Sequence, residues 1–157
     1  MFTTRNLTKK KVPAVPFLKL ADFVLGKKYE LSLVLAEDVL TKKLNSQYRH
    51  QNKPTNILSF PYAKKMGEVF INLNQAEQES KLFAQNYMTP KRYPNQTSSS
   101  ARKSNQPALA FFSPSVAYKN YLAYLFIHGL LHLKGYEHSS KMESEECKIL
   151  KRFKKSL

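Results

Sequence analysis

The feature that most constrains this chain is a cluster of histidines: the sequence has four, and three of them fall between residues 128 and 138. That segment reads His-Gly-Leu-Leu-His-Leu-Lys-Gly-Tyr-Glu-His and follows an apolar run, which favours a buried helix. In a helix, His128 and His132 would lie on one face, about one turn (~5.4 Å) apart. Gly135 can take the left-handed conformation that ends a helix, so that the chain turns back and brings His138 to the same point.

The spacing of these histidines indicates a metal site. The pattern H-x-x-x-H-x-x-G-x-x-H has the ligand spacing of the metzincin metalloproteases, glycine included. A single histidine on an apolar face is usually an ordinary core residue, but three at this spacing favour metal ligands. Neutral imidazole is a good ligand for zinc, and three imidazoles leave a coordination position for water. We therefore predict one ion, zinc or a similar metal, bound by His128, His132 and His138.

Two nearby residues bear on what kind of metal site this is. Metzincins carry a glutamate after the first histidine as general base, and here that position is Gly129, which disfavours a peptidase. Cys147 offers a different alternative. If its thiol reached the ion, the site would be closed and structural, with three histidines and one cysteine.

Net charge narrows the possible partners. The formal charge is +15, from 26 basic and 11 acidic residues, which favours a polyanion and nucleic acid first. A membrane surface is less favoured, since no basic amphipathic helix with a strong apolar face stands out. The first residues lack the apolar core of a signal peptide, and the single cysteine excludes an internal disulfide framework. We expect a cytoplasmic protein with no membrane-spanning segment.

Hydrophobic periodicity predicts an α/β fold, with a small mixed sheet of about four strands flanked by helices and the metal-binding helix in the core. Residues 1–157 are expected to form a single domain, beginning with a partly ordered arm over 1–16. The expected elements are a helix over 17–25, a strand over 29–36, a helix opened by Glu37 and Asp38, strands over 56–60 (stopped by Pro61) and 68–73, a helix from the N-cap Asn74 to about 83, the metal-binding helix from Pro114, and a last helix opened by a capping box at Ser140.

Residues 84–113 are polar, broken by prolines and devoid of acidic residues. Such a stretch cannot bury enough apolar area to offset its ordering entropy. We interpret about 86–107 as an insertion, and two hypotheses remain open. It is either a basic loop with a role, through Lys91, Arg92, Arg102 and Lys103, or a flexible insertion without one.

Three further motifs support a resemblance to a known family. They are Leu-Asn-Ser-Gln-Tyr-Arg over 44–49, Pro-Thr-Asn-Ile-Leu-Ser-Phe-Pro over 54–61 and Gly-Glu-Val-Phe-Ile-Asn over 67–72. With the histidine segment they resemble the YbeY family, bacterial endoribonucleases that mature ribosomal RNA. That family carries L-N-x-x-Y-R, P-T-[DN]-V-L-S-F-P and G-D-[IV]-x-[IV]-S, and has glycine after the first histidine. The resemblance covers roughly residues 29–83 and 108–153. The chain departs from it at Glu68, Asn72 and Glu137, where the family usually has Asp, Ser and Asp.

The resemblance implies a metal-dependent, single-strand endoribonuclease acting in ribosomal RNA maturation and ribosome quality control. Its partners would be ribosomal RNA and ribosomal subunits or proteins, with neither DNA nor a membrane expected. His128 and Arg49 would be its catalytic residues, because Arg49 matches a motif arginine that the family ties to activity. A guanidinium suits that role, since its planar fork binds two phosphate oxygens. Without the resemblance, Arg49 would be interpreted as an ordinary surface arginine.

Other polar residues near these motifs have weaker claims. Glu68 and Glu137 could assist a metal-bound water or simply be solvated, and His50 is taken as incidental. One alternative function remains, a non-catalytic ribosome-assembly or RNA-binding factor whose metal only stabilises the fold. The open coordination position favours the enzyme.

Overall fold

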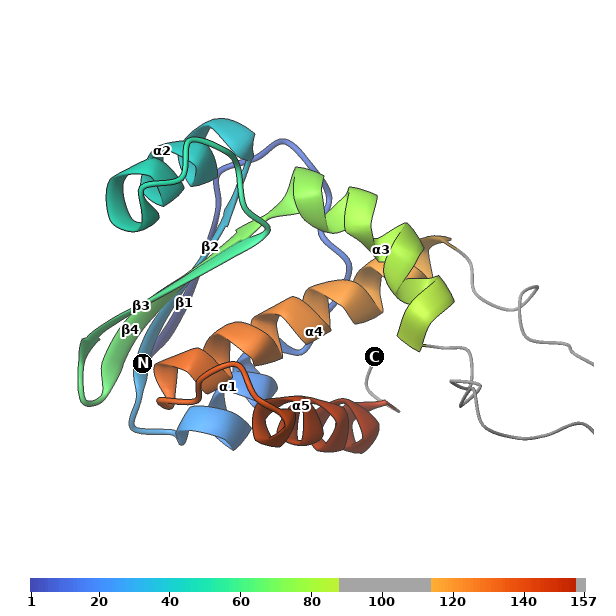
Figure 1. Cartoon of the computed structure of the whole chain (residues 1–157). Coiled ribbons are helices and arrows are strands. Elements are labelled where there is room, and N and C mark those ends of the chain that lie inside the picture. Colours follow the sequence, from blue (N-terminus) through green and yellow to red (C-terminus); the bar gives the residue numbers. More distant parts are fainter. Residues whose placement is uncertain (88–113, 155–157) are drawn as a thin grey trace, which may run out of the picture.

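The computed structural model describes residues 1–87 and 114–154 (Figure 1). Within these ranges the chain forms four strands and five helices. They are β1 (Phe2–Asn6), α1 (Phe17–Leu25), β2 (Glu30–Ala36), α2 (Asp38–Arg49), β3 (Ile57–Ala63), β4 (Met66–Asn72), α3 (Leu73–Tyr87), α4 (Pro114–Leu133) and α5 (Ser140–Phe153).

The four strands form one mixed sheet in the order β1-β2-β4-β3. β1, β2 and β4 run parallel, and β3 pairs with β4 in the antiparallel direction as an edge strand. Val69 of β4 pairs with Leu33 of β2 on one side and with Ser59 of β3 on the other. The predicted mixed sheet of about four strands is therefore confirmed.

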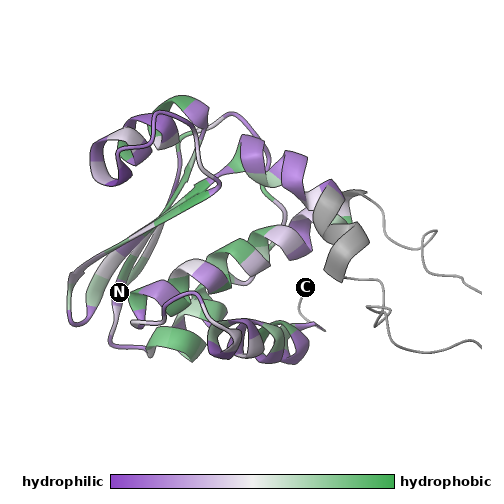
Figure 2. Ribbon diagram, in the orientation of Figure 1, coloured by the Kyte–Doolittle hydropathy of each residue, from purple (hydrophilic) through white to green (hydrophobic). Residues whose placement is uncertain are grey.

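Helices cover both faces of the sheet. Figure 1 shows α2 on one side and α1, α4 and α5 on the other. Alternate residues of the strands, including Leu33, Val69 and Ile71, join the core on the α4 side. Phe126 and Ile127 of α4 are completely buried there, which confirms that the helix carrying the first two histidines lies in the core. Figure 2 shows hydrophobic residues concentrated on the strands, α1 and α4, with more hydrophilic ones on α2 and α5.

The first strand was not predicted. Residues 1–16 were expected to be a partly ordered arm, yet Phe2–Asn6 pairs with β2 over its whole length. Apart from the half-buried Phe2, its side chains are exposed, so the strand leaves no apolar period in the sequence. Its order comes from backbone hydrogen bonds to a neighbour that is distant in sequence, and a local pattern cannot reveal these.

The sequence predicts that Pro61 ends the strand, and this prediction is wrong. The strand continues to Ala63, and Pro61 pairs with Gly67. Because β3 is an edge strand, a residue without an N–H is tolerated there. The pairing shifts between Pro61 and Ala63, which leaves Tyr62 as an extra residue in a bulge-like irregularity.

Two helix caps lie beside the predicted residues. Ser139, not Ser140, accepts the N–H of Met142, because Ser139 is the last extended residue before α5. Asn72, not Asn74, accepts the N–H groups of Asn74 and Gln75 at the start of α3. In both places the cap belongs to the residue at which the extended backbone ends.

The predicted insertion over about 86–107 falls almost entirely outside the described residues, so its two hypotheses stay open. In the described parts of the chain, no helix has both the length and the apolarity needed to cross a bilayer.

Candidate metal centre

The end of α4 brings the histidines together. Gly135 has a φ of 93° and its N–H donates to the carbonyl of His132, while the N–H of Tyr136 donates to the carbonyl of Leu131. These two bonds with a left-handed glycine form a Schellman motif, which closes the helix and reverses the chain. The predicted turn at Gly135 is confirmed.

The three imidazoles meet at one place. One ring nitrogen from each of His128, His132 and His138 lies within 4.8 Å of the other two. The ring centroids are 4.6 Å apart for His128 and His132, 5.1 Å for His128 and His138, and 4.7 Å for His132 and His138. His128 and His132 are half-buried and His138 is exposed, so the group, hereafter the histidine cluster, opens to solvent on one side.

Hydrogen bonds fix the orientation of two of the rings. Nδ1 of His132 lies 2.9 Å from the carbonyl oxygen of Tyr136, and since a carbonyl only accepts, this nitrogen carries the proton. Nδ1 of His128 lies 2.6 Å from Oε1 of Glu146. When that carboxylate is ionised, Nδ1 of His128 is likewise the donor. In the neutral rings, the proton-free Nε2 atoms are then the ones that face each other, 3.0 Å apart.

This donor arrangement fits a divalent cation. Two lone pairs facing each other at 3.0 Å repel unless a proton or a metal ion lies between them. Histidine ligands of metals nearly always donate the other ring N–H to a carboxylate or a backbone carbonyl, as His128 and His132 do here. Burial is the largest cause of the lowered pKa of His132, and the charge of His128 is the next largest. A lower pKa favours the neutral imidazole that a metal needs.

Glu146 was missed in the sequence, although a signal was present. It lies on α5 at helical spacing between Met142 and Ile149, two residues of the buried stripe. Its side chain is only 7% exposed. An acidic residue in an apolar stripe is costly to bury without a partner, so its position could have indicated a buried hydrogen bond.

Gly129 has a structural explanation. A Cβ atom at this position would lie 2.8 Å from Cδ1 of Ile57, 2.8 Å from Oγ of Ser59 and 3.2 Å from Cγ1 of Val69. Residue 129 therefore faces the sheet, where α4 packs against β3 and β4. A glutamate could not serve there as the base of a peptidase.

None of the three other candidate residues, Cys147, Glu137 and Glu68, joins the cluster. Cys147 is exposed on α5, and among the described residues only the three histidines form a group able to hold an ion. Glu137 is exposed, next to His138 in sequence. Oε1 of Glu68 accepts a hydrogen bond from the hydroxyl of Ser32, and Oε2 accepts one from the hydroxyl of Tyr62. These bonds hold the carboxylate of Glu68 on the α2 side of the sheet.

Arg49 lies at the end of α2, exposed to solvent. Asn45 anchors the loop that follows. Its carbonyl accepts from the N–H groups of His50 and Gln51, and its Nδ2 donates to the carbonyl of Lys53 at 2.8 Å. The positive charge of Arg49 is among the weaker causes that lower the pKa of His132, after burial and the neighbouring histidines. The arginine is therefore close enough to act electrostatically on the cluster. His50 only caps α2, in the left-handed conformation.

The fold and the histidine cluster define an α/β protein with a three-histidine centre suited to a divalent ion. The chain belongs to the family described as Endoribonuclease YbeY, whose model matches residues 4–92 and 100–155. Proteins named Endoribonuclease YbeY are similar to it. The one from Ehrlichia ruminantium (strain Welgevonden) is 32% identical over 76% of this chain and 63% of its own length. The one from Neorickettsia sennetsu is 30% identical over 81% of this chain and 75% of its own.

The matched region thus spans less than two thirds of the length of the Ehrlichia relatives. The fold has a solved counterpart in the solution structure of TM1509 from Thermotoga maritima. That structure has a TM-score of 0.54 and 21% identity, and the match covers 94% of this chain and 86% of the other. The α/β fold predicted from the sequence is confirmed.

Proposed function

We propose that this protein is a metal-dependent endoribonuclease that cleaves single-stranded regions of ribosomal RNA. The observation that carries the proposal is the histidine cluster, with its two Nε2 atoms 3.0 Å apart and both Nδ1 atoms hydrogen-bonded. Membership of the Endoribonuclease YbeY family supports the substrate class. The same membership supports a role in ribosomal RNA maturation and ribosome quality control, in the cytoplasm and with ribosomal subunits or proteins as partners.

His128, His132 and His138 would hold the ion, with zinc as the first candidate. Bound by three neutral imidazoles, such an ion would keep its full charge and would lower the pKa of water at the site to about 7, so that a nucleophile would be available without a glutamate at position 129. Glu146 and the carbonyl of Tyr136 orient the two helix histidines through their Nδ1 protons.

Arg49 would act on the phosphate. Cleavage of a phosphodiester develops negative charge on the phosphate oxygens, and a planar guanidinium can bind two of them at once. Arg49 is exposed and its charge reaches His132. It would bind a phosphate of the substrate while the scissile bond lies beside the cluster.

The test is single-turnover cleavage of a ribosomal RNA precursor by the purified protein, before and after removal of metal with a chelator. The proposal expects cleavage that chelation abolishes and that stoichiometric zinc or a similar ion restores. Wild-type protein that never cleaves, or that cleaves equally well without metal, contradicts it. RNA binding with bound metal but no turnover would favour the alternative, a metal-stabilised ribosome-assembly or RNA-binding factor.

A further inference from the structure

The α2 side of the sheet carries two exposed tyrosines near Arg49. Tyr48 is 57% exposed and Tyr62 is 62% exposed, and both are among the large hydrophobic residues that the described parts of the chain leave open to solvent. Large aromatic rings are normally buried or held against a partner, so two of them together at a surface indicate an interaction site.

Phe60 packs against Tyr48 and against Phe70 of the neighbouring strand. Its ring centroid is 4.9 Å from that of Tyr48 and 5.8 Å from that of Phe70. Because Val69 and Ile71 face the core, the alternate residue Phe70 and the ring of Phe60 that packs on it lie on the opposite face, towards α2. Phe60 thus packs against the ring of Tyr48, and the rest of that ring is exposed to solvent.

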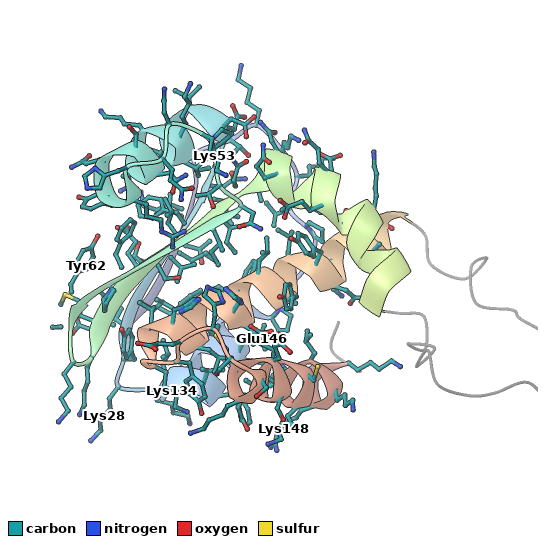
Figure 3. All side chains as sticks on the ribbon, viewed as in Figure 1. Lys28, Lys53, Tyr62, Lys134, Glu146 and Lys148 are labelled. Carbon is teal, nitrogen blue, oxygen red and sulfur yellow. The ribbon has the colours of Figure 1, made fainter. Side chains whose placement is uncertain are left out.

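Tyr62 is fixed on the same face. It is the unpaired residue between Pro61 and Ala63, and bulges of this kind redirect a side chain. Its hydroxyl donates to Oε2 of Glu68 at 2.9 Å. Figure 3 shows the ring projecting from the β3–β4 hairpin on the side where α2 lies. Desolvation, and then the bond to Glu68, raise the pKa of Tyr62 to about 12. Tyr48 packs on Phe60, which lies two residues before Tyr62 in β3, so both tyrosines lie on this face of the sheet.

The charge around these rings is complementary to a polyanion. Arg49 follows Tyr48 directly, Lys64 and Lys65 lie exposed at the turn of the hairpin beside Tyr62, and Lys53 lies in the loop after α2. Two carboxylates on this face already accept hydrogen bonds: Glu68 from Tyr62 and Ser32, and Asp38 from Asn72 and Gln75. Aromatic rings interleaved with cationic side chains are the usual means of binding single-stranded nucleic acid.

We propose that Tyr48 and Tyr62 form a stacking platform for unpaired RNA bases, with Arg49 and the hairpin lysines holding the adjoining phosphates. The inference rests on the proposed function and deepens it, because it names the residues that hold the unpaired bases of the single strand. β3 is the edge strand, so a bound strand can pass from this platform, over the edge and past Arg49, to the histidine cluster. A duplex has no free base faces to offer, so the platform selects single strands.

Tryptophan reporters can test base stacking directly, because the sequence contains no tryptophan. The variants Tyr48→Trp and Tyr62→Trp keep an aromatic face at each position. Phe23→Trp is the matched control, since Phe23 is an exposed aromatic residue of α1, on the other side of the sheet. Its ring centroid lies 5.5 Å from that of Phe153. The probe is a 2′-O-methylated oligoadenylate of about ten nucleotides, within the usual site sizes. It is added to the full-length, metal-loaded protein and checked to be intact afterwards.

The account expects the oligoadenylate to quench the emission of Tyr48→Trp and Tyr62→Trp and to leave Phe23→Trp unchanged. An abasic strand of equal length and charge should bind more weakly and not quench. In the protein without a tryptophan reporter, Tyr48→Leu and Tyr62→Leu should each weaken binding of the oligoadenylate by about fivefold or more. Tyr48→Phe and Tyr62→Phe should not weaken it.

Equal quenching by the abasic strand, quenching of all three reporters alike, or no quenching at all would overturn the inference. So would leucine variants that bind as well as wild type. Failure of the proposed function is separate from these outcomes: wild-type protein that does not cleave ribosomal RNA refutes the nuclease even if the reporters show stacking. A wild type that cleaves without reporter quenching refutes only the platform.

Discussion

The histidine cluster and Arg49 belong to regions built in different ways. The cluster lies at the end of a buried helix, and two of its rings are held by hydrogen bonds to Glu146 and the carbonyl of Tyr136. Arg49 lies at the exposed end of α2, and its backbone is fixed through Asn45 rather than through its own side chain. The first region positions ligands before anything binds, whereas the second leaves a long cationic side chain free to meet a substrate.

This difference predicts separable effects of mutation. Changes in the cluster should alter metal binding, stability and cleavage together. Changes at Arg49 should alter cleavage with metal and stability preserved. Substitutions at His128, Arg49, Glu146 and Gly129 test that separation.

The largest effect is expected from His128→Asn. It removes one of the three proposed metal ligands and the partner of a buried carboxylate, so stoichiometric metal should be lost and cleavage should fall to background. Leaving Glu146 without its partner should also cost about 1–3 kcal/mol of unfolding free energy. Metal analysis, single-turnover kinetics and thermal unfolding measure the three effects. His50→Asn is the control, because His50 lies outside the cluster in a left-handed conformation that asparagine tolerates. A His128→Asn protein that keeps full metal would contradict the ligand assignment.

Arg49→Lys should come next. Lysine keeps the charge but cannot bind two phosphate oxygens through a planar fork, so cleavage should fall by about 10²–10³-fold. Metal content and melting temperature should be unchanged. The same substitution at Arg5 serves as the control, since Arg5 is exposed on β1 at the opposite edge of the sheet. Full-rate cleavage by Arg49→Lys would remove the arginine from the mechanism.

Glu146→Ala should have a smaller effect, on metal affinity. Loss of the carboxylate frees the imidazole of His128 to rotate and to change tautomer, which should weaken metal binding by about 10–100-fold. Glu146→Gln keeps an oxygen that can accept the Nδ1 proton and should lose much less. Competition against a chromophoric chelator measures both. Equal affinities in wild type and Glu146→Ala would show that Glu146 does not position the histidine.

The smallest effect is expected from Gly129→Ala. Alanine favours a helix by up to about 1 kcal/mol over glycine, but its Cβ would lie 2.8 Å from atoms of Ile57 and Ser59. Overpacking of a core costs about 1–3 kcal/mol, so the close contact should win and the protein should lose about 1–2 kcal/mol. Ser46→Ala, at an exposed position of α2, should be neutral or slightly stabilising. Chemical denaturation compares the two. A stabilised Gly129→Ala protein would mean that α4 packs less tightly on the sheet than described.

The histidine cluster could be predicted because its geometry is local. One helical turn separates His128 from His132, and the turn at Gly135 is encoded by a residue that favours a positive φ. Glu146 and β1 could not be placed in the same way. The carboxylate reaches His128 from another helix, and β1 is ordered by backbone pairing that leaves no side-chain pattern.

The α2 region shows the opposite case. Only the resemblance to a family distinguishes the motif around Arg49, because neither periodicity nor spacing separates this arginine from other surface cations. The structure gives the motif a physical basis. Asn45 anchors the loop and Tyr48 packs on Phe60, so the end of the helix that carries Arg49 is held beside the edge strand.

X-ray absorption spectroscopy of the metal-loaded protein at its native metal edge would identify the ligands of the ion. We expect one ion per chain with three imidazole nitrogens at about 2.0–2.1 Å and at least one position that the protein does not fill. A sulfur ligand, a shell completed by four protein side chains, or a protein that retains no ion would contradict it.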